Sequence, residues 1–308
     1  MKLPNTLQEA VRYFADPQHC LDLLITLRWP HGPVCPKCHS QEYGFLKSRS
    51  IWQCKHCRKQ YSAKAGTIFE DSPMPLDKWF CALWMIVSAK NGVSSYEVAR
   101  SIGVTQKTAW FMMHRIRLAL QQGSIERKLM GEVEVDETYI GGAARNMHAD
   151  KQLKMKRIEG SYRKAIVVGM LERKGEVRAE VVNRASAKLL QGAIQKHIVP
   201  GSQLYTDELN AYIGVRKDYA HQVINHAEEY VRGNVHTNSI ENFWSLLKRG
   251  IKGTYVGVEP FHLFRYLDEQ SFRFNTRKGN DQGRFMQALS TISGKRVTYQ
   301  ELIGQTTH

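Results

Sequence analysis

The chain has 308 residues, of which 42% are hydrophobic and 10% aromatic, so it can bury a sizeable core and is neither disordered nor fibrous. Its 44 lysines and arginines outnumber 29 aspartates and glutamates, which gives a formal charge of +15 at pH 7 and favours a polyanionic partner such as nucleic acid. The charge alone does not exclude an ordinary basic soluble protein, because the excess is spread along the chain.

The lack of a recognisable signal peptide or membrane span, together with the cysteine usage, predicts a cytoplasmic protein. The opening residues, MKLPNTLQEA, lack the apolar core of a signal peptide, and the longest apolar run, residues 79–89, is too short to cross a bilayer. Of the six cysteines, four form two close pairs, while Cys20 and Cys81 stand alone and are expected to be buried as small apolar residues. This pattern suits a metal site in a reducing compartment better than a disulfide framework.

The paired cysteines predict a zinc ribbon. Two C-x2-C pairs are separated by fifteen residues, which is the ligand spacing of a tetrahedral zinc site: Cys35, Cys38, Cys54 and Cys57. The intervening short strands hold too little apolar material to fold without a metal, so the zinc would be structural. A redox dithiol is the alternative, but nothing around the pairs resembles a strand–helix redox unit.

A helix-turn-helix is predicted next. Residues 76–92 form an apolar helical stretch that ends at Gly92, and two shorter helices follow with Gly103 at the turn between them. Six residues fall at the core positions that this motif requires: Val98, Ala99, Ile102, Val104, Ala109 and Met112. A helical bundle that only packs or dimerises would show the same periodicity.

The second helix of this motif, residues 105–120, would carry the contacts to double-stranded DNA. Its first residues, Thr105, Gln106 and Lys107, would face a DNA groove. His114 would contribute to the same contact. Arg115 and Arg117 would meet phosphates.

From residue 131 the pattern changes to short β-type runs. Residues 132–142 and 164–182 read as three strands, residues 185–199 as a helix, and residues 202–212 as a further strand. This order predicts an α/β fold with an RNase H-like core, that is, a mixed five-stranded sheet with helices.

Acidic residues occupy two strand positions in this core. Glu132, Glu134 and Asp136 share one face of the first strand by the two-residue period. Acidic side chains are unusual on a strand predicted to lie at the centre of a sheet, so their presence calls for an explanation. Asp207 follows the fourth strand, at the kind of strand terminus where open α/β sheets place ligands. Glu134 is a possible auxiliary ligand.

A third carboxylate lies in a predicted helix, residues 236–250. Glu241 and Lys248 are seven residues apart, so they project within about 20° of each other, opposite an apolar face. Asn238 and Glu241 also fit a helix capping box, and Asp207 could simply end a strand in a turn. Glu137, Glu208 and Asn242 are neighbouring alternatives at the three carboxylate positions.

Phosphodiester chemistry explains why three carboxylates would be gathered. Two Mg²⁺ or Mn²⁺ ions about 3.5–4 Å apart activate a nucleophilic oxygen and stabilise a leaving oxygen, and such hard cations bind carboxylates. Asp136 would bridge the two ions, Asp207 would bind one and Glu241 the other. Lys248 would contact DNA phosphate.

The chain resembles bacterial and archaeal insertion-sequence transposases of the DDE class that carry an N-terminal zinc ribbon. The resemblance covers nearly the whole chain and is specific in its combination of stretches: RWPHGPVCPKC (28–38), WQCKHCRKQYSAKAGTIF (52–69), VDETYIGG (135–142), YTDELNAY (205–212), HTNSIENFWSLLKRGIKGTY (236–255) and FRFNTR (272–277).

This resemblance implies a prokaryotic, nucleoid-associated enzyme that cuts transposon ends and joins their 3′ ends to target DNA. By motif match it places the catalytic carboxylates at Asp136, Asp207 and Glu241, with Lys248 as the accompanying lysine. Some relatives carry asparagine at the third position, so Asn238 and Asn242 remain alternatives there, and relatives often have histidine where this chain has Val256.

A basic insert separates the first two strands. Residues 143–164 carry seven basic residues against two acidic ones, and we expect Lys154, Lys156 and Arg157 to grip the DNA backbone near the cleavage point. A solvated loop is the alternative.

The expected domains are residues 1–70 with the zinc ribbon, 71–125 with the helix-turn-helix, and 126–308 with the catalytic core. A dimer or larger synaptic complex is expected because two DNA ends must be brought together. Two other functions fit the same modules: a non-catalytic DNA-binding regulator derived from a transposase, and an RNase H-like nuclease or resolvase that cuts without joining.

Overall fold

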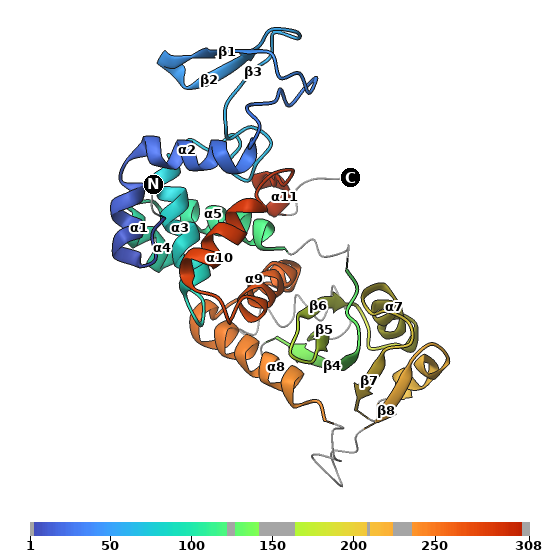
Figure 1. The fold of residues 1–308 in the computed structure, drawn as a ribbon. Coiled ribbons are helices and arrows are strands. Elements are labelled where there is room, and N and C mark those ends of the chain that lie inside the picture. The colour runs from blue at the N-terminus through green and yellow to red at the C-terminus, as the bar shows by residue number, and fades with distance from the viewer. Residues whose placement is uncertain (1–2, 122–126, 142–163, 208–209, 224–235, 304–308) are drawn as a thin grey trace. The chain divides into compact units, whose positions relative to one another are not determined.

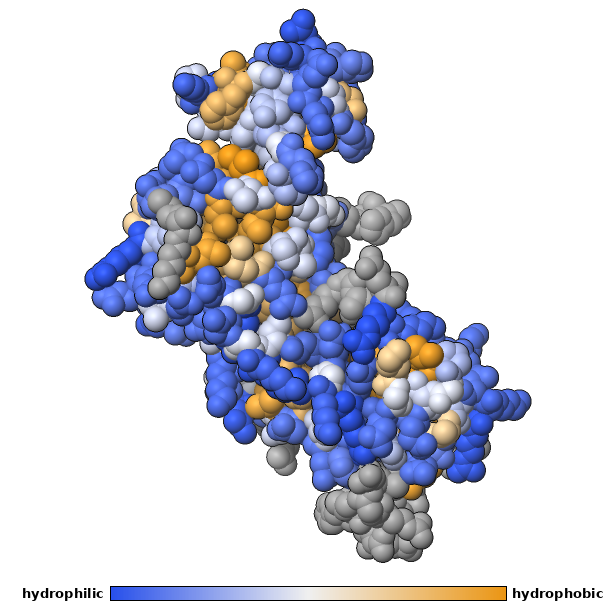
Figure 2. Space-filling view, in the orientation of Figure 1, coloured by the Kyte–Doolittle hydropathy of each residue, from blue (hydrophilic) through white to orange (hydrophobic). Residues whose placement is uncertain are grey.

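The computed structural model describes residues 3–121, 127–141, 164–207, 210–223 and 236–303 (Figure 1). The chain divides into two compact units: unit 1 comprises Met1–Gln122 and Thr276–His308, and unit 2 comprises Gly123–Asn275. None of the described helices is long and apolar enough to cross a membrane. On the face shown in Figure 2, hydrophilic residues cover most of the surface, and apolar residues gather over the helical part of unit 1.

Unit 1 is mainly helical. Its helices are α1 (Leu7–Phe14), α2 (Pro17–Arg28), α3 (Leu76–Ser88), α4 (Ser95–Ile102), α5 (Gln106–Leu120), α10 (Asp281–Ser290) and α11 (Tyr299–Leu302). The starts follow from the sequence: Thr6 forms a capping box with Glu9 at α1, and Asp16 caps α2 ahead of Pro17.

The C-terminal segment belongs to unit 1, whereas the sequence grouped residues 276–308 with the catalytic core. Phe285 of α10 packs against three aromatic rings of the N-terminal helices, at centroid distances of 5.2 to 5.7 Å: Phe14, Phe80 and Trp84. The backbone N–H of Ile68 also donates to the carbonyl of Ile292. Burial of these rings stabilises the segment in unit 1.

The predicted ribbon is a three-stranded antiparallel sheet within unit 1. It is formed by β1 (Tyr43–Leu46), β2 (Ile51–Cys54) and β3 (Gln60–Tyr61), with a short 3-10 turn, η1 (Lys47–Arg49), between β1 and β2. Its apolar contacts are few and largely aromatic: Trp52 packs against Trp29 and Tyr61.

Unit 2 contains the predicted mixed sheet of five strands. The strands are β4 (Glu132–Ile140), β5 (Ala165–Glu172), β6 (Val177–Val182), β7 (Gln203–Thr206) and β8 (Ala220–Val223). They lie in the order β6-β5-β4-β7-β8, with the pairs β6–β5 and β5–β4 antiparallel and the pairs β4–β7 and β7–β8 parallel. This arrangement confirms the predicted fold class, because it matches an RNase H-like core with β4 at the centre.

Helices cover both faces of this sheet. One face packs against α7 (Ala187–His197) and the 3-10 segment η3 (Asn210–Lys217), and the other against α8 (Asn238–Gly250) and α9 (Leu263–Asn275). A π-helical turn, η4 (Ile251–Tyr255), and a 3-10 turn, η5 (Pro260–His262), connect α8 to α9. The apolar face predicted for α8 is buried, as expected: Ile240, Phe243, Trp244 and Leu247.

Gly169 of β5 allows α8 to approach the sheet closely. A Cβ atom at this position would lie 2.5 Å from the Trp244 ring and 2.9 Å from Ile240. We expect Gly169→Ala to lower the free energy of unfolding by about 1–3 kcal/mol, because the helix must move away from the strand. Urea denaturation measures this change.

Gly192→Ala is the matched control for this variant. Gly192 is an exposed residue of α7, and a Cβ there meets no atom within 4 Å. Alanine should therefore stabilise that helix by about 0.5–1 kcal/mol. Equal stability of the two variants would contradict close packing at Gly169.

Candidate functional site

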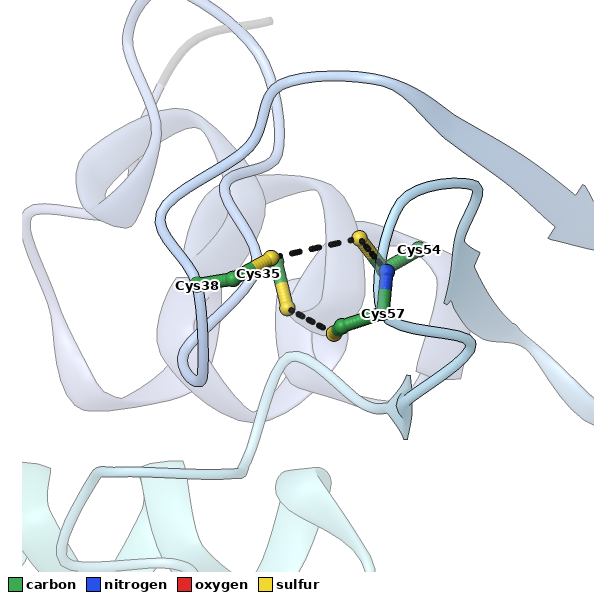
Figure 3. Close-up of side chains that lie close together, drawn as sticks. All are labelled: Cys35, Cys38, Cys54 and Cys57. Atoms are coloured by element: carbon green, nitrogen blue, oxygen red, sulfur yellow. Dashed lines mark hydrogen bonds between the residues drawn. The ribbon is translucent and has the colours of Figure 1, made fainter.

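The four paired cysteines converge in the ribbon (Figure 3). The Sγ atoms of Cys35 and Cys57 are 3.6 Å apart, and those of Cys38 and Cys54 are 3.5 Å apart. A tetrahedral zinc ion with sulfur ligands at about 2.3 Å separates the sulfurs by about 3.8 Å. The donor set and its spacing therefore fit zinc.

The backbone around the second cysteine pair favours the thiolate. The N–H of Cys57 donates to the Cys54 sulfur, and this contact is the main cause that lowers the pKa of Cys54 to about 6. Because the thiolate is the form that binds metal, Cys54 is prepared to bind zinc at neutral pH.

The two helices predicted for the helix-turn-helix form as α4 and α5. Gly103 adopts a left-handed conformation, with φ of 63°, at the end of α4, and Thr105 caps α5 by accepting from the N–H of Thr108. Gln106 donates to Ser95 of α4. Thr105 and Lys107 are exposed, and the Lys107 ammonium lies 4.8 Å from the centre of the Tyr299 ring.

Three other residues of α5 differ from the expectation that they face DNA. His114, Arg115 and Arg117 are at most 2% exposed. The Arg115 guanidinium donates to the carbonyl of Glu70 and lies over the rings of Trp79 and Phe111, and burial lowers its pKa. In this conformation the three side chains pack the interior of unit 1, because α5 is covered on more sides than a two-helix motif implies. The insert residues Lys154, Lys156 and Arg157 lie outside the described residues.

An acidic cluster lies at the centre of the unit 2 sheet. Asp136 and Glu137 come from β4, and Asp207 directly follows β7. Carboxylate oxygens of the three residues lie within 4.8 Å of one another, so they could hold a metal ion. The structure thus brings together Asp136 and Asp207, as the sequence predicted, and adds Glu137, which the sequence offered only as an alternative.

The short length of β7 explains how adjacent residues of one strand reach the same cluster. The parallel pairing of β4 with β7 ends at Glu134 and Tyr205, and β7 itself ends at Thr206, whereas β4 continues to Ile140. Side chains on opposite faces of β4 can therefore both approach Asp207 around the end of the shorter strand. Strict alternation would have directed Glu137 away from Asp136.

Hydrogen bonds fix the two carboxylates that β4 contributes to the cluster. The Trp244 indole Nε1–H donates to Asp136 Oδ2 at 2.9 Å, and the backbone N–H of Glu137 donates to Oδ1 at 2.8 Å. On the other face of the sheet, the hydroxyl of the fully buried Tyr212 donates to Glu137 Oε2 at 2.8 Å. The sequence pattern placed Trp244 on the apolar face of α8 and gave Tyr212 no role, although a buried indole or phenol usually finds a polar partner.

The site is built to favour a cation. Burial, followed by the charge of Glu137, raises the pKa of Asp136 to about 7, although the Trp244 hydrogen bond opposes the shift. Burial also raises the pKa of Glu137. Clustered carboxylates that are partly removed from water gain most from a divalent ion, which replaces the missing solvation and offsets their repulsion.

Glu241 and Lys248 lie beside this cluster. They line a pocket of about 330 Å³ together with five other residues: Asp136, Glu137, Thr138, Trp244 and Ser245. Glu241 and Lys248 therefore lie on the same side of α8, as the helical period predicted. All three candidates on α8, Asn238, Glu241 and Asn242, are exposed, but only Glu241 lines this pocket.

The start of α8 differs from the capping box that the sequence allowed. Thr237, rather than Asn238, is the N-cap residue, and it makes no side-chain capping bond to the helix. The Thr237 hydroxyl instead donates to Glu241 Oε1 at 3.3 Å.

The sequence also matches two known domain families. Residues 128–275 match the ISXO2-like transposase domain, and residues 16–60 match the transposase zinc-ribbon domain. Residues 128–275 form an ISXO2-like transposase domain. The chain is similar to an uncharacterized protein in transposable element ISH50 of Halobacterium salinarum, with 26% identity over 298 residues that cover 92% of this chain and 97% of that protein.

These matches confirm the predicted relationship to insertion-sequence transposases with an N-terminal zinc ribbon. The transposase domain contains the acidic cluster, Glu241 and Lys248, and the zinc-ribbon match contains all four paired cysteines. The transposase domain also ends at Asn275, where unit 2 ends.

Proposed function

We propose that this protein is a DNA transposase that cleaves phosphodiester bonds at transposon ends and joins the 3′ ends to target DNA with two metal ions. The observation that carries the proposal is the pocket shared by Asp136, Glu241 and Lys248, beside Asp207 and inside the transposase domain. It combines metal-binding carboxylates with a cation for DNA phosphate.

The donor set fits hard divalent cations. It offers carboxylate oxygens and no sulfur or imidazole within the cluster, which is the ligand type of Mg²⁺ and Mn²⁺. When bound, two such ions supply activation of the attacking oxygen and stabilisation of the leaving oxygen. Asp136 and Glu137 belong to both the cluster and the pocket, and Asp136 comes from the strand position that the motif assigns to the first catalytic carboxylate.

Different residues of the site would bind the two metal ions and the DNA phosphate. Asp136 would serve both ions, Asp207 with Glu137 would hold one, and Glu241 would hold the other. Lys248, which lines the same pocket, would neutralise a DNA phosphate. Trp244 keeps one Asp136 oxygen oriented, which limits the rotamers that the carboxylate can adopt.

The other parts of the chain would bind DNA and assemble the ends. Thr105, Gln106 and Lys107 at the start of α5 would contact the terminal repeats, and the basic insert with Lys154, Lys156 and Arg157 would grip the backbone. The four cysteines would hold a structural zinc ion. A homodimer or larger synaptic complex in the cytoplasm would bring two ends together.

Strand transfer tests the proposal directly. A labelled terminal-repeat oligonucleotide is incubated with plasmid, the purified chain and Mg²⁺, and joined products are resolved by electrophoresis. Joining supports a transposase. Cutting without joining would favour the nuclease or resolvase, and binding without cutting would favour a regulator.

Metal affinity should depend on pH because of Asp136. Its raised pKa means that the folded, metal-free site holds a proton up to about pH 7, and a metal ion must displace that proton. Below pH 7 the Mn²⁺ affinity should therefore fall by about tenfold per pH unit, and above it the affinity should level off. Calorimetric titration with Mn²⁺ at pH 6, 7 and 8 measures this change.

The same shift makes the metal-free protein less stable as pH rises. Between the ordinary aspartate pKa of about 4 and pH 7, the folded state binds more protons at Asp136 than the unfolded state does, so the free energy of unfolding falls with increasing pH.

Mn²⁺ affinity that is the same at pH 6 and pH 8 would contradict the assignment of Asp136 as a metal ligand.

A further inference from the structure

Glu134 is a fully buried carboxylate two residues before Asp136 on β4, and its oxygens are occupied by α8 and an arginine. Oε2 accepts from the backbone N–H groups of Ser239 and Ile240 at 2.9 and 3.0 Å, and Oε1 accepts from Arg173 Nε at 3.0 Å. The sequence suggested Glu134 as an auxiliary metal ligand. Its oxygens instead satisfy donors of the protein, which leaves them poorly placed for a metal ion.

These bonds replace a missing helix cap. The first N–H groups of a helix have no partner within the helix, and Thr237 at the N-cap position of α8 provides no side-chain bond to them. Glu134 reaches them from another element and also places a negative charge at the positive end of the helix. The start of α8 is thereby tied to the central strand.

Arg173 completes the connection. Its Nη2 donates to the carbonyl of His236 at 2.8 Å, and its guanidinium lies 4.1 Å from the centre of the Tyr205 ring. A single planar cation therefore contacts Glu134, the segment before α8 and the end of β7. We call Glu134 and Arg173 the α8 clamp.

The α8 clamp and Asp136 hold the helix at two points on either side of Glu241. Glu134 binds the N–H groups of residues 239 and 240, and Asp136 binds the indole of Trp244. Both carboxylates project from the same face of β4, so the helix turn that carries Glu241 is fixed against the strand that carries Asp136.

We propose that Glu134 and Arg173 are positioning residues that set the location of Glu241 relative to Asp136, and through it the affinity of the site for divalent metal. The inference rests on the proposed function, because it takes Glu241 to be a metal ligand. Neither residue would touch the metal or the DNA.

The test is direct binding of Mn²⁺ by the full-length chain, followed by electron paramagnetic resonance of the free ion. Glu134→Gln should raise the Mn²⁺ concentration for half-saturation by about tenfold or more, as loss of an outer partner of a metal ligand does. Glutamine cannot replace the carboxylate, because its NH₂ group would face either the helix N–H groups or Arg173. Glu180→Gln is the matched control, since Glu180 is ion-paired with Lys196 and His197 of α7, and it should bind Mn²⁺ like the wild type.

A double-variant cycle separates positioning from a general loss of structure. If Glu134 acts through Glu241, then Glu134→Gln should add little to the effect of Glu241→Gln, whereas two independent losses would add. If Glu134→Gln does not fold, Arg173→Lys is judged by the same criteria, because lysine keeps the charge but cannot contact Glu134 and the His236 carbonyl together.

Wild-type Mn²⁺ binding by folded Glu134→Gln or folded Arg173→Lys would overturn the inference, as would additive effects in the cycle. Failure of the proposed function is a different result. In that case the wild type would not join DNA ends, although the Mn²⁺ titrations would still report whether the α8 clamp sets metal affinity.

Discussion

Asp136→Ala is expected to reduce DNA cleavage and strand transfer by at least about a thousandfold, which corresponds to a loss of about 4 kcal/mol of transition-state stabilisation. Asp136 contributes to both the acidic cluster and the pocket with Glu241, so its removal affects both metal positions. Asp207→Ala should cause a loss of similar order. Initial rates with Mg²⁺ and a labelled terminal-repeat oligonucleotide measure both variants.

Two further variants make this result specific. Asp136→Asn keeps the size of the side chain and an acceptor for the Trp244 indole, and it should be as inactive as alanine if the negative charge is what matters. Asp218→Ala removes an exposed carboxylate of the same unit and should leave the rate unchanged. Strand transfer by Asp136→Ala at more than a tenth of the wild-type rate would refute the proposed chemistry.

Cys35→Ser is expected to release zinc and unfold the ribbon. Structural zinc contributes about 10–16 kcal/mol of apparent binding free energy in small zinc-dependent folds, far more than the few aromatic contacts of the ribbon can replace. Zinc content measured by elemental analysis should fall from about one ion per chain to near zero. Limited proteolysis should then cut between residues 35 and 60.

Cys81→Ser is the control for this variant, because Cys81 is a single cysteine of α3 outside the thiol cluster. It should keep its zinc and its resistance to protease. Wild-type protein that contains no zinc, or a Cys35→Ser ribbon that stays protease-resistant, would contradict a structural zinc site.

The sequence by itself determined the features that depend on local spacing. Two C-x2-C pairs predicted the thiol cluster, the two-residue period placed Glu134 and Asp136 on one face of β4, and the helical period placed Glu241 and Lys248 on one side of α8. These predictions succeeded because the backbone geometry of a turn, strand or helix fixes the direction of each side chain within that element.

Only the tertiary structure decided which elements meet. Asp207 joins Asp136 because β7 pairs with β4, and Glu137 joins them because β7 ends sooner than β4, a difference in strand length that no local pattern records. For the same reason the sequence could not show that Glu134 caps α8, that Arg115 is buried, or that α10 packs in unit 1. Each of these outcomes depends on packing between segments far apart in the chain, where burial and hydrogen-bond satisfaction outweigh local preference.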